Sequence, residues 1–309
     1  DRRCSGALWP LKRSIWTFIP LLVGILGLGW GLTEYLGRMS QQEMQSGVRE
    51  SLGLLVSRLH IVTAMADDVA KSMAESPWVL PALSGGGEEA RDAANKVADL
   101  SMGAAGGDGI AYLMDGSGTV LASSNRGRSD SLMGNNYGFR PYFREAFAGK
   151  AAYYFALGVT TGERGYYASH PVRDQAGRIA GVAVIKKPLD PIGSDLRGIE
   201  HTFLISPQGV VFLASDPDML FKTLWPLPAE TQLALTRSRQ FGNLRYAPML
   251  DREIADGAWI AFRGERHYAG RRGSGHDGWS FVVFKIPTAV AASRLFGITI
   301  TLLFAVLTV

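Results

Sequence analysis

Cysteine is almost absent from this chain, since Cys4 is the only one in 309 residues. A single cysteine can form neither a disulfide within the chain nor a metal site built from several thiolates. Charge is also scarce, because charged residues make up 19% of the sequence against 47% hydrophobic residues, and the formal net charge is only +4. The basic residues are scattered or lie beside apolar segments, so nucleic-acid binding is not indicated.

The short motifs of common hydrolases and redox enzymes are missing as well. The sequence contains no G-x-S-x-G, no H-E-x-x-H, no P-loop and no G-x-G-x-x-G that opens a helix. A metal site formed by His170 and His201 is conceivable, but ordinary hydrogen-bonded histidines are the stronger expectation without ligand spacing. We therefore expect no catalytic residues, no metal and no cofactor in this segment.

Two apolar runs lie near the ends of the chain. The first, at 15–36, has the length of one membrane crossing. Arg2, Arg3, Lys12 and Arg13 precede it, which places residues 1–14 in the cytoplasm by the positive-inside rule. A cleaved signal peptide is the alternative, but the run is long for one and no small-residue cleavage site clearly follows it.

The second apolar run, at 293–309, resembles a membrane helix that stops before it is complete. We therefore expect this chain to be the front part of a longer protein. Two spans would place residues of about 37–290 outside the cytoplasmic membrane. That layout is typical of a transmembrane receptor, and a membrane-anchored enzyme shares it.

The segment 37–106 is expected to be helical. A first helix should run from Leu36 to about Ser76, because Pro77 is a natural stop, and a second from Glu88 to about Met102. Apolar residues follow the first helix at three-four spacing, which fits either pairing with a copy of itself or packing along its own domains. These residues are Leu52, Leu55, Leu59, Val62, Met65, Val69 and Met73.

Strand patterns dominate the rest of the chain, and they occur twice. A hairpin at 110–124, a second at 153–172 and a strand at 179–186 form the first set, and the runs 201–215 and 281–287 repeat its beginning and end. An internal repeat of this size indicates two copies of one fold. Antiparallel strands with a helix to one side make each copy α+β, at 107–195 and 196–288.

The stretch 135–149 stands out within the first copy. Pro141 suits the first turn of a helix, and Phe139, Phe143 and Phe147 recur every four residues, which predicts one buried stripe. Tyr137 and Arg140 then fall off that stripe and can face a cleft. A guanidinium beside a phenol is a plausible carboxylate clamp. The alternative, a surface arginine that closes a helix end, is slightly favoured by spacing alone.

Further polar groups follow in the second hairpin and in the strand after it. Thr160 and Thr161 offer hydroxyls and exposed amides in a turn, and Ser169 shares a strand face with Tyr167. If Lys186 faces the cleft, it adds a second cation, and two separated cations favour a small dicarboxylate. Ordinary turn chemistry explains the threonines equally well, and Lys285 at the matching place of the second copy suggests a scaffold role for Lys186.

Three segments together resemble a known family. They are N-Y-G-F-R-P-Y-F at 136–143, Y-F-A-L-G-V-T-T-G-E-R-G-Y-Y at 154–167, and I-K at 185–186. This set is similar to the periplasmic sensor of the C4-dicarboxylate transport sensor histidine kinases (DctB type), a double-Cache or tandem PAS-like architecture. The resemblance covers essentially the whole chain between the two apolar runs.

The resemblance implies a long N-terminal helix and two PAS-like modules between two membrane helices, with a cytoplasmic kinase beyond the second span. It implies a homodimer in the bacterial inner membrane, a cognate response regulator, and succinate, fumarate or malate as the ligand. By motif, Tyr137 and Arg140 would hold one carboxylate and Lys186 the other, while Thr160, Thr161 and Ser169 would add hydrogen bonds. In the expected pattern A-L-G-T-T-S, Val159 replaces the first threonine and Thr161 the serine, which puts the identity of the ligand in doubt.

Other outputs fit the same sensor fold. A chemoreceptor or a diguanylate cyclase that senses another small carboxylate or an amino acid is the main alternative. A membrane-anchored interaction module that binds no small molecule is the other. The residues that follow position 309 in a longer chain would distinguish them.

Overall fold

The computed structural model describes residues 9–242 and 247–308, with side chains from residue 18 onward. Arg2 and Arg3 and the side chains of Lys12 and Arg13, on which the cytoplasmic placement of the N-terminus depends, lie outside the described part. The chain forms two compact units. The larger one holds 52–256 and 271–284, and the smaller one holds the remaining described residues.

Helices make up the first third of the chain. The first, α1 (Trp9–Glu75), ends two residues before Pro77, as predicted. A short helix, α2 (Leu80–Leu83), follows it, and α3 (Gly87–Ala104) confirms the second predicted helix. Gly87 has a φ of +77°, a conformation that residues with a Cβ rarely adopt, so the glycine run allows the chain to turn between these two helices.

The inner face of α1 within the larger unit differs in part from the predicted stripe. Leu52, Leu55, Leu59 and Met73 are buried, as expected. Farther along the helix, the predicted residues Val62, Met65 and Val69 are only half-buried. The buried positions there hold smaller residues, namely Thr63, Ala66 and Ala70. Small side chains let the helix backbone approach its neighbours closely, and the Thr63 hydroxyl is satisfied by the Leu59 carbonyl at 2.9 Å.

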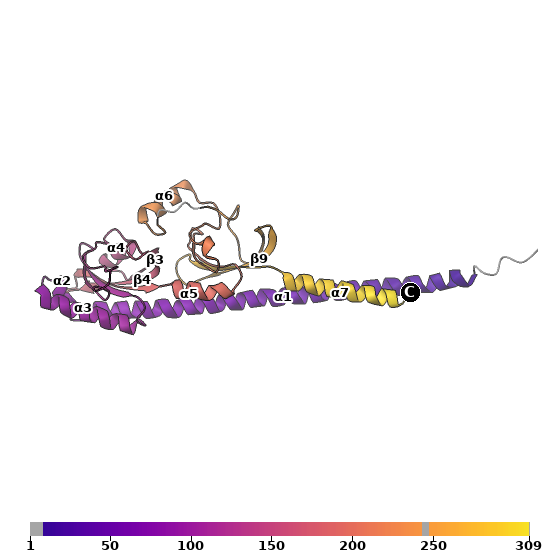
Figure 1. The fold of residues 1–309 in the computed structure, drawn as a ribbon, viewed down its shortest axis with the longest axis horizontal. Coiled ribbons are helices and arrows are strands. Elements are labelled where there is room, and N and C mark those ends of the chain that lie inside the picture. The colour runs from indigo at the N-terminus through magenta and orange to yellow at the C-terminus, as the bar shows by residue number, and fades with distance from the viewer. Residues whose placement is uncertain (1–8, 243–246, 309) are drawn as a thin grey trace, which may run out of the picture. The chain divides into compact units, whose positions relative to one another are not determined.

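The first sheet has five antiparallel strands in the order β2-β1-β5-β4-β3. Figure 1 shows this sheet with α4 (Pro141–Phe147) on one side and α1 with α3 on the other. The strands are β1 (Ile110–Asp115), β2 (Val120–Ser123), β3 (Ala152–Leu157), β4 (Arg164–Arg173) and β5 (Ile179–Pro188). A short helix, α5 (Asp190–Asp195), and a 3-10 turn (Leu196–Gly198) lead to the second sheet.

The second sheet repeats the first, with the strand order β7-β6-β10-β9-β8. Its strands are β6 (Thr202–Ile205), β7 (Val211–Ala214), β8 (Ala258–Phe262), β9 (Glu265–Gly273) and β10 (Ser280–Lys285). A 3-10 turn (Pro217–Met219) and α6 (Ala229–Ser238) lie between β7 and β8. The predicted α+β class with two copies of one antiparallel fold is therefore confirmed. We refer to the copies by their sheets, as the first module and the second module.

The predicted phenylalanine stripe in α4 is wrong. Phe143 is buried, but Phe147 is 37% exposed and Phe139 is only half-buried. The reason is that the helix begins at Pro141, so Phe139 precedes it and does not follow its period. The inward face of the helix consists of Tyr142, Phe143 and Ala146.

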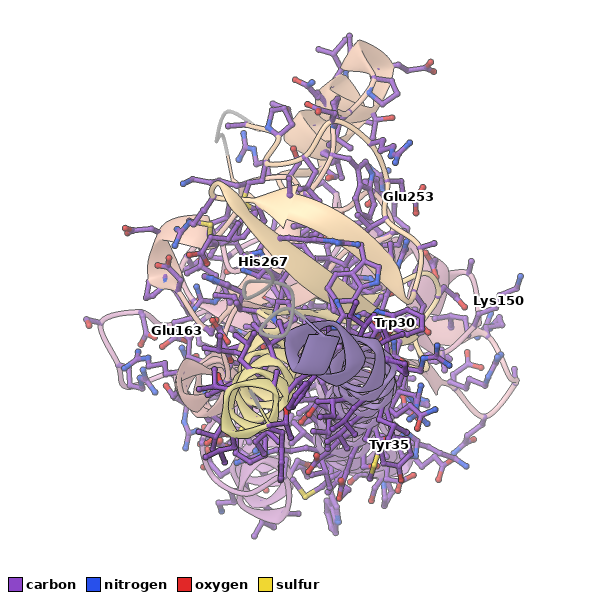
Figure 2. All side chains as sticks on the ribbon, turned by 90° about the vertical axis from the view of Figure 1, so that its right-hand side faces the viewer. Trp30, Tyr35, Lys150, Glu163, Glu253 and His267 are labelled. Atoms are coloured by element: carbon purple, nitrogen blue, oxygen red, sulfur yellow. The ribbon has the colours of Figure 1, made fainter. Side chains whose placement is uncertain are left out.

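Two helices of the described chain are long and apolar enough to cross a membrane, namely the apolar part of α1 and α7 (Thr288–Leu307). Only 6% of the apolar window in α1 and 11% of that in α7 is buried, so neither resembles the core helix of a soluble domain. Figure 2 shows the two helices almost end-on and side by side, with Trp30 on the side of α1 away from α7.

Small residues form the seam between these two helices. Gly29 lies against Thr301, Gly297 lies against Thr33, and the hydroxyls of Ser40 and Ser293 are 2.6 Å apart, so the helices run antiparallel. A Cβ added to Gly297 would lie only 2.9 Å from the Cα of Thr33. Close backbone approach through small residues is the usual way in which helices associate in membranes.

The seam can be tested by cross-linking in membranes. In a Cys4→Ser background, the pair Ser40→Cys and Ser293→Cys should oxidise readily to a disulfide. Adding Gly297→Ile should slow the cross-link, because the side chain cannot fit against Thr33. Gly31→Ile is the matched control, since a Cβ at Gly31 has no neighbour within 4 Å. Equal cross-linking rates in both variants would show that the seam does not form this way.

Candidate functional site

The start of α4 places Tyr137 and Arg140 beside the first sheet. The Tyr137 amide donates to the Gly118 carbonyl at 2.8 Å, and the Arg140 amide donates to the Tyr137 carbonyl at 2.9 Å. Gly118, in the turn between β1 and β2, has a φ of +87°, and a Cβ there would collide with the backbone of Gly138. This position therefore requires glycine, so that the loop before α4 can pack against the turn. Arg140 is the extended N-cap residue of α4, and its side chain reaches a cavity.

All of the predicted site residues except Ser169 line this one cavity. It lies within the larger unit and has a free volume of about 20 Å³, which is room for roughly one water molecule. Its lining consists of Tyr112, Leu132, Tyr137, Arg140, Tyr142, Gly158, Val159, Thr160, Thr161, Tyr167 and Lys186.

Arg140 is a buried cation that hydrogen-bonds only to carbonyl groups among the described residues. The residue as a whole is only 2% exposed. Its Nη2 donates to the Leu157 carbonyl at 2.9 Å. Nη1 lies 3.4 Å from the Ser238 carbonyl and 3.3 Å from the Arg239 carbonyl. No described carboxylate pairs with it. A buried charge without a counter-ion is costly, so the guanidinium is a strong attractor for an anion.

Tyrosines form much of the remaining wall. The Tyr137 hydroxyl is 2.7 Å from Thr160 Oγ1, and the Tyr112 and Tyr142 hydroxyls are 2.8 Å apart. The Tyr142 and Tyr167 rings stack with centroids 5.1 Å apart. Burial raises the pKa of the Tyr112, Tyr142 and Tyr167 phenols above their usual value. They therefore stay neutral and can donate hydrogen bonds to an anion without repelling it.

Lys186 supplies the second cation, as predicted, but with a partner that was not predicted. The residue is 2% exposed, and its Nζ donates to Thr161 Oγ1 at 2.6 Å and to Glu163 Oε2 at 2.9 Å. Burial lowers the pKa of Lys186, and the hydrogen bond and charge of Glu163 oppose that shift. Glu163 lies in the same turn as Thr161. An acidic residue in that turn was therefore the sequence feature from which a partner for Lys186 could have been predicted.

Ser169 lies beneath the site and not in its wall. It is fully buried, and its hydroxyl is 3.0 Å from the Tyr142 carbonyl and 2.9 Å from the Ala152 carbonyl. Since a hydroxyl has one proton to donate, the two carbonyls share it. Ser169 thereby connects β4 to α4 and β3, and it supports the backbone under Tyr142, a lining residue.

The second module also contributes to the surroundings of Arg140. Beyond the carbonyls of Ser238 and Arg239, the Leu157 amide donates to the Gln240 carbonyl at 2.8 Å, and Gln240 Nε2 donates to the Phe155 carbonyl at 2.9 Å. Arg239 has a left-handed φ of +52° at the end of α6. No sequence signal pointed to the segment 238–240, because it is about a hundred residues from Arg140 and carries no motif.

Aromatic contacts join the two modules at a second place. The His276 ring packs edge-on against Tyr153, Phe155 and Tyr166, with centroids 5.0, 5.1 and 5.6 Å away. The neighbouring Asp277 amide donates to the Tyr153 hydroxyl at 2.7 Å. Burial lowers the pKa of His276, so the neutral ring is the form that fits this contact.

Comparisons with known proteins agree with this architecture, although no family model matches the chain. It is 29% identical to the C4-dicarboxylate transport sensor protein DctB of Pseudomonas aeruginosa over 252 residues. The matched region covers 80% of this chain and 40% of that protein. The chain thus spans less than half the length of the curated relatives it matches.

Solved structures show the same fold. The sensor domain of the histidine kinase DctB from V. cholerae matches with a TM-score of 0.69 and 23% identity, over 79% of this chain and 98% of that one. The sensory domain of the Campylobacter jejuni chemoreceptor Tlp3 with isoleucine bound matches with a TM-score of 0.57 and 12% identity, over 83% and 98%. The predicted resemblance to a DctB-type sensor region is confirmed.

The support that Ser169 gives to the site can be measured. Ser169→Ala leaves two buried carbonyls without this donor, so the free energy of unfolding should fall by about 1–3 kcal/mol in urea denaturation. Ser57→Ala, at an exposed position of α1, is the control and should not lower it. An unchanged stability for Ser169→Ala would mean that the hydroxyl does not hold the strands and helix together.

The contact of His276 predicts a pH dependence of stability. Because the folded-state pKa is lowered, the unfolded chain takes up the proton more readily. The stabilisation is therefore fully present above the ordinary histidine pKa of about 6.5 and is lost as the pH falls below it. Thermal unfolding between about pH 7.5 and about pH 5.5 should show a steeper loss for the wild type than for His276→Phe. Parallel curves would contradict this role.

Proposed function

We propose that this chain is the extracytoplasmic sensor region of a transmembrane histidine kinase and that its first module binds a small C4-dicarboxylate. The observation that carries the proposal is Arg140, a buried guanidinium without an acidic partner among the described residues, facing a cavity lined by neutral phenols. One ligand carboxylate would bind Arg140 and Tyr137. The other would bind Lys186, with Thr160 and Thr161 as additional donors.

The charge pattern favours a dicarboxylate over an amino acid. An amino acid brings an ammonium group that needs an anionic or several neutral acceptors. Among the described residues, the cavity wall contains no carboxylate, and Glu163, which reaches the lining residue Lys186, is bound to its ammonium group. Two cations and several hydroxyl donors suit succinate, fumarate or malate better.

Binding would require the cavity to widen, because a C4-dicarboxylate needs several times the present free volume. In our proposal, a carboxylate on Arg140 draws the guanidinium away from the Ser238 and Arg239 carbonyls. The ligand would thereby change the contact between the two modules. Such a shift between two arrangements is how binding in one module would bias a remote output.

The setting of the sensor is part of the same proposal. The two apolar helices would hold the chain in the bacterial inner membrane, with residues of about 37–290 in the periplasm. The domain limits 37–106, 107–195 and 196–288, predicted from the sequence, are part of this proposal. Leu54 and Ile61, one heptad apart on α1, are 68% and 67% exposed, which supports a homodimer through this helix. A response regulator would be the partner of the kinase.

A chemoreceptor or a diguanylate cyclase carrying the same sensor is the second candidate. The fold shared with the Tlp3 sensory domain supports it. Sequencing the gene beyond codon 309 distinguishes the candidates, because a phosphoacceptor histidine with an ATP-binding domain, a long methylated coiled coil and a GGDEF-like domain are easily told apart.

The ligand proposal predicts a specific loss of affinity. In calorimetric titration of the whole chain in detergent with succinate, Arg140→Ala should weaken binding by about thirtyfold or more, equivalent to about 2 kcal/mol, because one carboxylate loses its bidentate partner. Arg144→Ala is the matched control, since Arg144 is exposed on the same helix and does not line the cavity.

Circular dichroism of each variant shows whether it is folded. Equal affinity of Arg140→Ala and wild type would remove Arg140 from the site. Failure of the wild type to bind or to be stabilised by any C4-dicarboxylate would refute the ligand and favour the interaction-module alternative.

A further inference from the structure

The two cations of the cavity have different partners. Among the described residues, the Arg140 side chain hydrogen-bonds only to carbonyl groups and has no acidic partner, so its charge is available to an anion. Lys186 is already neutralised, because its Nζ lies 2.9 Å from the Glu163 carboxylate. The two ends of the site therefore differ in how strongly they attract a carboxylate.

The turn that carries Glu163 is held together by its own backbone. The Gly158 amide donates to the Glu163 carbonyl at 2.9 Å, and the Gly162 amide donates to the Gly158 carbonyl at 2.8 Å. The Glu163 side chain, by contrast, is 47% exposed and is not part of the cavity wall. It reaches Lys186 from the solvent side, so it can swing away into water without any change in the turn.

The hydrogen-bonding capacity of Lys186 limits what else can bind there. An ammonium group has three donors, and Thr161 and Glu163 take two of them. A ligand carboxylate that binds the remaining donor comes close to the Glu163 carboxylate and shares one positive charge with it. Like charges this near repel each other, so either the ligand is held weakly or Glu163 must leave.

We propose that Glu163 is a specificity-determining residue that competes with the second carboxylate of the ligand for Lys186. It weakens the binding of dicarboxylates and leaves that of monoanions nearly unaffected, because a monoanion uses only the Arg140 end. This inference rests on the proposed carboxylate-binding function and adds a role for a residue outside the cavity wall.

The test compares two ligands of the same size and different charge, succinate and its half-amide succinamate. Both are titrated into the whole chain in detergent, as the wild type and as Glu163→Gln. Removing the competing charge should lower the Kd for succinate by roughly threefold to tenfold, while the Kd for succinamate stays within about twofold. The gain for succinate should shrink as salt is added, because the Glu163 side chain is 47% exposed and its charge is screened.

Glu145→Gln is the matched control, since Glu145 is exposed on α4 and does not line the cavity. It should leave both affinities as in the wild type. A rise in Kd for both ligands in Glu163→Gln would show that Glu163 merely positions Lys186, and this would overturn the inference. Unchanged values for both ligands would overturn it too. If the wild type binds neither ligand, the proposed function itself fails, which is a distinguishable result.

Discussion

The arrangement around the cavity depends on a buried guanidinium whose described hydrogen-bond partners are all carbonyl oxygens. Arg140 draws the end of β3 and the segment after α6 toward itself, because a buried cation must be solvated by whatever dipoles the protein can bring to it. Carbonyl dipoles do this less well than a carboxylate. The contact between the two modules and the proposed affinity for an anion thus have one origin, the incomplete solvation of this one charge, and a change in either would affect the other.

Much of the fold could be predicted from the sequence, because the strands and helices follow local rules. Turn residues and apolar runs located the first sheet and the first two and last strands of the second, and Pro77 located the end of α1. The strands β8 and β9 of the second sheet were not predicted. Predictions of which side chains are buried were weaker, because burial depends on neighbours distant in sequence. Phe147 follows the right spacing but is 37% exposed, and Ala66 and Ala70 are buried although no hydrophobic pattern marks alanine as a core residue. The spacing of apolar residues indicates roughly which face of a helix is buried. Only the packing against other elements decides which side chains on that face are buried.

The candidate site was predictable to the extent that its residues lie in recognisable loops. Tyr137, Arg140, Thr160, Thr161 and Lys186 all line the cavity, as the two loops and the strand suggested. Ser169 lies on the expected face of β4 but one layer deeper, because Tyr142 occupies the space between it and the cavity. The segment 238–240 could not be predicted at all, since its contribution consists of backbone carbonyls, which every residue has. Contacts made by the main chain cannot be predicted from the types of the residues that make them.

The repeated strand order has a consequence for how such a sensor can change over evolutionary time. The second module carries the same sheet as the first but, in its sequence, no counterpart of the Tyr137–Arg140 stretch. The second module nevertheless takes part in the site of the first, because the carbonyls of Ser238 and Arg239 are hydrogen-bond acceptors for Arg140. Under the proposed function, a change of backbone conformation at 238–240 would alter how strongly Arg140 attracts an anion, while every residue of the proposed clamp is retained. A sensor of the proposed kind would then change its specificity through its second copy, without a substitution in the proposed clamp itself.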